Sequence, residues 1–191
     1  MFSTDSFPKR SILLLLTAIL VPLFARTPAV HAQLALGITP AVGFYGESGL
    51  VPETFGFEGH IHLDWLPPFL PARLEGLGLA ATVGISTVST EDETGSDVDT
   101  LGFFFGAGVL YHFSLGPLEV RPGFYAGFQY SIFDGVDADD EIPLMVQPHL
   151  EVAWAFPRGI SAGLYLGYKM LLYDDLEASI TLGPRLRYRF P

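Results

Sequence analysis

Four polar side chains alternate with apolar and glycine residues in the segment 55–67, "FGFEGHIHLDWLP". They are Glu58, His60, His62 and Asp64, each two positions from the next. On a β-strand this spacing places all four on one face. A His-x-His pair beside a carboxylate is also a spacing found among zinc ligands. The segment therefore has two interpretations, a metal site or the polar face of a sheet whose other face meets an apolar environment.

A second pair with chemical potential lies in "YHFSLGP", where His112 and Ser114 stand two residues apart. A histidine that can activate a serine hydroxyl is the basis of a hydrolase site. The pair precedes a tight turn, and its parity directs both side chains to the same face as the glycines of this segment. We keep a lipid-modifying enzyme that uses His112 and Ser114 as an alternative to a non-enzymatic role.

Two acid-rich segments, "EDETGSDVD" and "DGVDADDE", offer oxygen ligands of the kind that calcium and magnesium prefer. They lack the ordered spacing of an EF-hand loop, with its central glycine and distal glutamate. We expect a solvated acidic rim that could share divalent cations with surface phosphates, and no dedicated metal site.

The elements that must position these groups are β-strands. Hydrophobic residues recur with a period of two, and clusters of Gly, Pro and Asp interrupt this pattern at regular intervals. The pattern predicts an all-β chain of eight antiparallel strands in up-and-down order, with no competing helix. The expected ranges are 34–46, 54–66, 77–89, 101–114, 118–133, 142–156, 160–173 and 178–190.

The two faces of these strands differ in side-chain size. One face carries bulky Leu, Phe, Ile, Val, Tyr and Trp residues and no charge, as a lipid-facing surface requires. The opposite face is rich in glycine, which suits the narrow interior of an eight-stranded barrel. A soluble lipocalin-like barrel that binds a ligand would turn the apolar face inward instead, and it is the alternative orientation.

With the glycine-rich face inward, many polar residues meet in the lumen. Five cations and four carboxylates are nearly balanced there, as a dehydrated interior requires if its charges are to pair. This favours a polar network that plugs the barrel over a metal site or a catalytic site. The expected network comprises Glu58, His60, His62, Asp64, Glu119, Arg121, His149, Glu151, Lys169, Arg185, Arg187 and Arg189, with Gln129 and Gln147 beside them.

The connections divide by charge. The joins after the first, third, fifth and seventh expected strands hold most of the acids and no Lys or Arg, whereas Arg73 and Arg158 lie at the other end. Near that basic end, aromatic residues on the apolar face predict half of a membrane-interface girdle. They are Trp65, Tyr111, Phe113, Trp154, Phe156, Tyr188 and Phe190.

The first 32 residues have the pattern of a cleavable signal peptide. Lys9 and Arg10 precede an apolar core that is too short to span a bilayer, and "AVHA" supplies the cleavage site after Ala32. The remainder, 33–191, suits one domain, and the chain contains no cysteine. A formal net charge of −11 argues against nucleic acid as a partner.

The signal peptide, the eight alternating strands and the final "ITLGPRLRYRF" together resemble the small outer-membrane β-barrel proteins of the OmpA, OmpX and OmpW kind. The resemblance is one of pattern and covers 33–191. It implies a transmembrane barrel in the cell outer membrane, with lipid and the barrel assembly machinery as partners, no cofactor and a monomeric state. The expected role is structural or interactive, with acidic external loops, or the narrow passage of small solutes.

Overall fold

A computed structural model describes residues 33–46, 54–71, 74–91, 97–134, 142–172 and 176–191. The expected signal peptide at 1–32 and most of the acidic connections lie outside these ranges. Within them, no helix has the length and apolar character needed to cross a membrane.

The described chain is almost entirely β-structure, as the alternating pattern predicted. Most expected strand boundaries are met within two residues. The elements are β1 (Gln33–Gly46), β2 (Thr54–Leu66), β3 (Leu77–Glu91), β4 (Asp97–Tyr111), β5 (Phe113–Leu115), β6 (Leu118–Asp134), β7 (Leu144–Ala155), the 3-10 turn η3 (Pro157–Gly159), β8 (Ile160–Leu172) and β9 (Leu176–Arg189).

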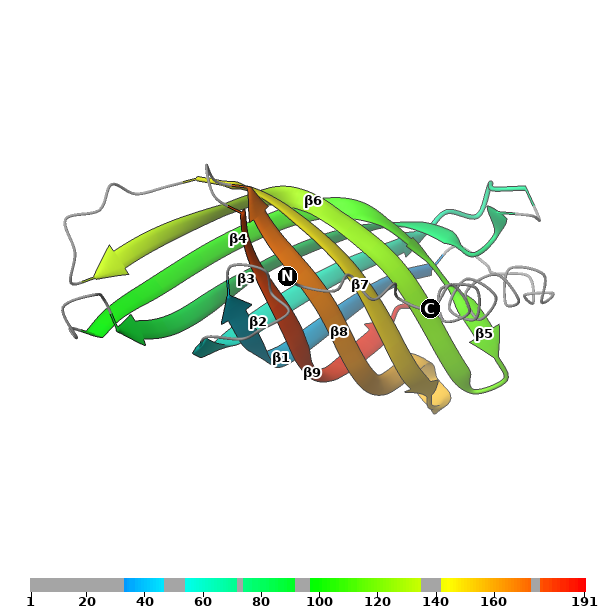
Figure 1. Ribbon diagram of the computed structural model, residues 1–191. Helices are drawn as coiled ribbons and strands as arrows, with labels where there is room; N and C mark the ends of the chain where they lie inside the picture. Colours follow the sequence, from blue (N-terminus) through cyan, green and yellow to red (C-terminus); the bar gives the residue numbers. More distant parts are fainter. Residues whose placement is uncertain (1–32, 47–53, 72–73, 92–96, 135–141, 173–175) are drawn as a thin grey trace, which may run out of the picture.

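All strand pairs are antiparallel, and the sheet closes on itself. The order is β4-β3-β2-β1-β9-β8-β7-β6-β5, and β4 also pairs with β6. Since β5 continues the path of β4 along β6, the wall has eight strands, and the first and last of them, β1 and β9, are neighbours. Figure 1 shows the strands running obliquely around this barrel. The prediction of an eight-stranded up-and-down barrel is confirmed.

The fourth strand differs from its expected range of 101–114 at both ends. It begins earlier, at Asp97, because the ladder with β3 continues beyond the apolar stretch and pairs Ser89 with Asp99. The Ser89 hydroxyl donates to the Asp99 carboxylate at 2.5 Å and ties the two strands together there. At its other end the strand is interrupted at His112, so that β5 is a separate piece. The acidic connection after β3 is therefore shorter than expected.

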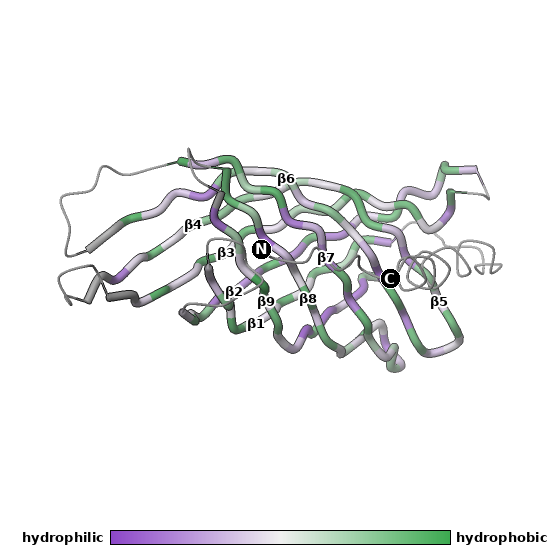
Figure 2. Tube along the Cα trace, viewed as in Figure 1, coloured by the Kyte–Doolittle hydropathy of each residue, from purple (hydrophilic) through white to green (hydrophobic). Residues whose placement is uncertain are grey.

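Burial alternates along the strands, and the bulky apolar residues are on the outside. Phe57, Ile61, Leu79, Phe105 and Leu164 are among many large hydrophobic side chains that are exposed. In Figure 2 hydrophobic and hydrophilic positions alternate along the tube. A soluble lipocalin-like barrel would bury these side chains. The observed orientation is that of a transmembrane barrel, whose outer surface faces lipid.

Glycine lets two strands of the wall pack closely. Gly127 in β6 is paired with Gly106 in β4, and both are buried. A Cβ atom on Gly127 would collide with the carbonyl oxygen of Phe105. At this position the absence of a side chain is a steric requirement of the strand pairing.

The pairing of β1 with β9 contains a gap. The register joins Ile38 to Leu186 and resumes with Val42 and Leu182, and no pairing connects the residues between them. The same register brings Pro40 and Pro184 opposite one another within the gap. Because proline has no amide hydrogen to donate, a ladder cannot be completed there. The barrel therefore closes between β1 and β9 through a ladder that is interrupted at Pro40 and Pro184.

Candidate functional site: the polar lumen

The candidate site is the interior of the barrel, which is filled by polar side chains that alternate with the outward apolar ones. All twelve residues of the expected network have side chains that point inward. Eleven of them are buried and engage in ion pairs, hydrogen bonds or ring contacts. The twelfth, Arg189, is partly exposed, with 25% of its side chain accessible. Arg189 differs because it ends β9 and so lies at the mouth of the barrel.

Glu58 is the centre of one cluster. Its carboxylate accepts hydrogen bonds from Lys169 Nζ at 2.7 Å, His60 Nε2 at 2.9 Å, Thr181 Oγ1 at 3.0 Å and the Tyr45 hydroxyl at 2.5 Å. These donors come from β1, β2, β8 and β9, so the carboxylate joins strands that are far apart in the sequence. A buried carboxylate is tolerated only when it is paired and hydrogen-bonded in this way.

A second cluster lies toward the end of the barrel where β1 begins and β9 ends. Arg185 reaches Asp64 at 3.0 Å and Glu151 at 3.2 Å, and Arg121 reaches the other oxygen of Glu151 at 2.9 Å. Arg121 also pairs with Glu119. The four residues Asp64, Arg185, Glu151 and Arg121 thus form a continuous chain of charges across the lumen, and Arg187 and Arg189 join it through Glu119.

Aromatic rings and histidines separate the two clusters. The His60 and His62 rings are stacked with centroids 5.4 Å apart, and His149 stacks on Tyr125 at 4.5 Å. Tyr165 contacts all three histidine rings at centroid distances of 5.3 to 5.6 Å. The barrel interior is therefore layered: an ionic cluster, a ring layer and a second ionic cluster.

The structure gives His60 and His62 roles within this packing. His60 binds the Glu58 carboxylate, while His62 Nδ1 lies 3.2 Å from the Tyr125 hydroxyl. Among the described residues, no three His, Asp or Glu side chains are grouped as metal ligands. The two imidazoles are thus on one face, as their spacing predicted, and their hydrogen-bond partners differ.

His112 and Ser114 also have different partners. His112 Nε2 lies 3.4 Å from Glu119 Oε1, whereas the Ser114 hydroxyl donates to the Gly116 carbonyl at 3.2 Å within the turn. Glu119 and Ser114 are paired residues of β6 and β5. The three groups of a hydrolase site are close in the fold, but the described contacts do not join the serine to the histidine.

Six of the seven residues expected in the aromatic girdle are at least partly exposed, and Phe113 is not. Its exposed fraction is 6%, and its ring lies 4.5 Å from that of Tyr111. The interruption of the strand at His112 removes the strict alternation on which the expectation for Phe113 rested. Tyr111 is partly exposed. The remaining five are exposed, and they are Trp65, Trp154, Phe156, Tyr188 and Phe190.

Sequence reasoning missed several uncharged members of the lumen. Tyr45, Tyr125, Tyr165 and Thr181 contribute hydrogen bonds or ring contacts to the two clusters and the ring layer. Their inward parity was readable from the alternation. The inner face was predicted from its glycine content and its charges, and neither feature marks a tyrosine or threonine as a lumen residue.

No protein-family model matches the chain, and no curated protein sequence matches it. Solved structures do match. Neisserial surface protein A aligns with a TM-score of 0.64 at 14% identity, covering 82% of this chain and 97% of that one. The Ail protein of Yersinia pestis gives 0.56 at 13% identity, covering 84% and 100%. A major outer membrane protein of Thermus thermophilus gives 0.54 at 18% identity, covering 84% and 100%.

These similarities define the class of the fold. The chain is a closed eight-stranded β-barrel of the type found in small bacterial outer-membrane proteins, as its resemblance to them implied. At these identities the comparison concerns the fold and leaves the activity to be argued from the lumen and surface of this chain.

Proposed function

We propose that the chain is an outer-membrane protein whose lumen is closed by its own charges and which acts in the structure or interactions of the envelope. The observation that carries this proposal is the layered interior, in which ionic clusters lie on both sides of a ring layer. An eight-stranded barrel has room only for its own side chains, whereas water-filled porins need about 16–18 strands. Small solutes could pass through the lumen only when these ionic clusters part transiently.

Export and placement in the outer membrane form part of this proposal. The expected signal peptide and the apolar outer surface support it, and outer-membrane lipid and the barrel assembly machinery are the partners it implies. The acidic connections would form the external rim, where divalent cations could bridge carboxylates and lipid phosphates. A heat-modifiable gel shift in the membrane fraction tests this placement, and a water-soluble monomer obtained without detergent would contradict it.

Planar-bilayer conductance of the refolded protein tests the closed lumen. The wild-type barrel should give a closed trace, because each buried carboxylate holds its cations in place across the lumen. A variant in which Glu58 and Lys169 are both replaced by alanine should open more often, since one of the two ionic clusters loses its central pair. A wild-type trace with a stable open level would contradict the proposal.

A lipid-modifying activity is the second candidate, and the proximity of His112 to Glu119 is the observation in its favour. The hydrogen bond that Ser114 makes within its own turn argues against it. Expression of the wild type and of a His112→Ala variant, followed by analysis of lipid A, separates the two candidates. An altered lipid A profile that depends on His112 in folded protein would establish the enzyme.

A further inference from the structure

The connection between β2 and β3 carries an unusually exposed aromatic ring. Phe69 is 73% exposed, more than any other large hydrophobic side chain of the described residues. The connection follows Leu66, which pairs with Gln33, and so lies at the end of the barrel where β1 begins. We call this the inner end, and Figure 1 shows the connection there, at the same end as β5.

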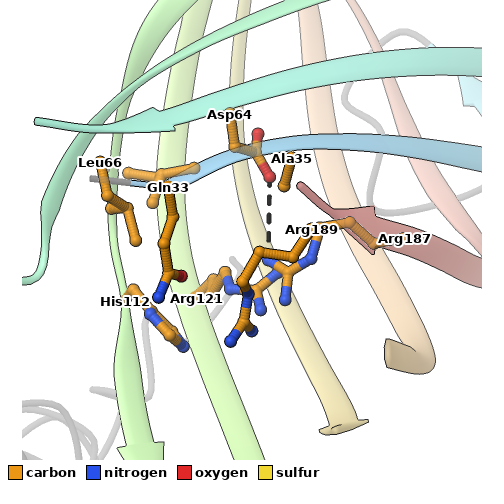
Figure 3. A pocket seen from close by; sticks show the side chains of 9 residues that line it. Gln33, Ala35, Asp64, Leu66, His112, Arg121, Arg187 and Arg189 are labelled. Atoms are coloured by element: carbon orange, nitrogen blue, oxygen red, sulfur yellow. Dashed lines mark ion pairs between the residues drawn. The ribbon is translucent and has the colours of Figure 1, made fainter. Parts of the chain in front are cut away.

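Phe69 lies on the outer side of the barrel wall. Leu66, the last residue of β2, is buried, and in Figure 3 its side chain lies beside those of Gln33 and His112 at the mouth of the lumen. Trp65, one residue earlier, points outward and is exposed. The Phe69 ring meets the Trp65 ring edge-on, with 6.1 Å between the centroids. The chain therefore turns after β2 and brings Phe69 next to the last outward residue of that strand.

The Phe69 ring continues the apolar outer surface of the barrel. Trp65 pairs with Leu34 on β1 and with Leu79 on β3, and both leucines are exposed on the same outer face. This face is the one that meets lipid, and tryptophan is typical of the boundary between lipid and water. Phe69 thus extends the lipid-facing surface past the end of the strands, at the depth of the membrane interface.

The backbone of this segment is suited to leaving water. Residues 66–71, "LPPFLP", contain no charged side chain and three prolines, and proline has no amide hydrogen to donate. Farther along, the Leu74 amide donates to the Pro71 carbonyl and the His112 amide donates to the Gly76 carbonyl, each at 2.7 Å. Because backbone donors must be satisfied wherever water is scarce, a segment with few of them can lie in the interface at low cost.

We propose that residues 66–71 dock on the surface of the phospholipid leaflet at the inner end, with the Phe69 ring inserted beside Trp65 as an anchor. Exposed apolar patches of this kind mark contacts with membranes or with other proteins, and continuity with the lipid-facing wall favours the membrane here. The inference rests on the proposed placement in the outer membrane. It adds that the connection lies against the bilayer and fixes the depth of the inner end.

A spin label at position 69 tests this docking. The chain contains no cysteine, so Phe69→Cys provides a single site for a nitroxide in the full chain refolded into phosphatidylcholine vesicles. Collisions of the label with oxygen, which partitions into lipid, and with a water-soluble nickel chelate are measured by power saturation. We expect collisions with oxygen to be favoured several-fold over collisions with the chelate.

Two further labelled positions serve as references. Leu166→Cys reports the lipid-facing wall, and Arg158→Cys reports an exposed charged residue in η3, another connection at the inner end. If the label at 166 does not favour oxygen, the membrane placement itself is wrong. If the label at 166 favours oxygen but the label at 69 favours the chelate, as we expect for position 158, only the docking is overturned.

A label at position 69 that meets neither reagent would also overturn the proposal, because protein would then cover the site. Crosslinking in the same vesicles would show whether this protein is a second copy of the chain.

A second variant keeps an aromatic ring at position 69 and needs no label. Phe69→Trp combined with Trp65→Phe and Trp154→Phe leaves one tryptophan, since the chain has two. In vesicles of lipid brominated on the acyl chains, its fluorescence should be markedly lower than in the same lipid without bromine. Equal fluorescence of the folded variant in the two lipids would contradict the insertion of this ring.

Discussion

Lys169 on β8 reaches Glu58 on β2, with 2.7 Å between Nζ and Oε1, and both side chains are withdrawn from solvent. The two residues are 111 positions apart in the sequence. On the sheet their strands are separated by β1 and β9, so the pair crosses the interior of the barrel. A substitution at this ion pair therefore measures how much the contacts inside the lumen contribute to the stability of the barrel.

Replacing Lys169 by methionine should destabilise the barrel by about 3–5 kcal/mol, because it leaves the buried Glu58 carboxylate without its cation. Urea unfolding in lipid vesicles, followed by tryptophan fluorescence, measures the change. The double variant Lys169→Met with Glu58→Gln should recover part of the loss, since no uncompensated charge remains. Equal stability of the single variant and the wild type would show that the pair is not important for stability.

Gly127→Ala should destabilise the wall where β6 passes β4. The added Cβ atom would collide with the Phe105 carbonyl oxygen, and the paired strands would have to move apart. Backbone cannot give way as a flexible side chain does, so we expect a loss of about 1–3 kcal/mol or a failure to refold. The heat-modifiable shift of the refolded protein on a gel reports the folded fraction.

Gly59→Ala in β2 is the matched control for this change. The nearest atom to an added Cβ there is Ile85 Cγ1 at 3.7 Å, an ordinary van der Waals distance. This variant should refold as the wild type does. If both glycine variants behave alike, close strand packing is not the reason for the glycine at position 127.

Much of this architecture follows from alternation alone. Since side chains on a strand point to opposite faces in turn, the sequence of β2 was enough to predict that Glu58 and Asp64 share the inner face. Alternation does not give the depth of a residue in the barrel, which depends on the register between strands. The partners of Glu58 on β8 and β9 could not be assigned for that reason. Phe113 was misplaced because an interruption of the ladder at His112 leaves no mark in the hydrophobic pattern.

The outer surface should reject a positive charge most strongly at mid-depth. Leu166 is exposed near the centre of β8, and Leu166→Arg should cost about 2–4 kcal/mol in lipid vesicles. Ile160→Arg, on the same face at the first residue of β8, should cost about 1 kcal/mol or less because the residue lies near the membrane interface. Equilibrium unfolding compares the two. A similar cost at both positions would contradict the assignment of this face to lipid.

The gap between β1 and β9 predicts a local difference in hydrogen exchange. Thr39 and Ala41 lie within the gap but face β2, where they pair with His60 and Glu58, whereas Ile38 and Val42 border the gap in pairs with β9. Hydrogen bonds next to an interruption of the ladder open more readily, so in micelles the Ile38 and Val42 amides should exchange faster than the amide of Phe44, which pairs with Ile180 farther from the gap. Replacing both Pro40 and Pro184 by valine restores two amide donors and should slow this exchange.

Each restored hydrogen bond contributes about 0.5–1.5 kcal/mol, which corresponds to a slowing of roughly two- to tenfold. Pro122→Val is the control, because β6 and β7 are paired continuously through Pro122 and Leu150, and this change should leave exchange in β1 and β9 unaltered. Mass spectrometry of peptides from β1 and β9 resolves these differences. Equal protection along the whole of β1 and β9 in the wild type would show that the opposed prolines do not weaken the closure of the barrel.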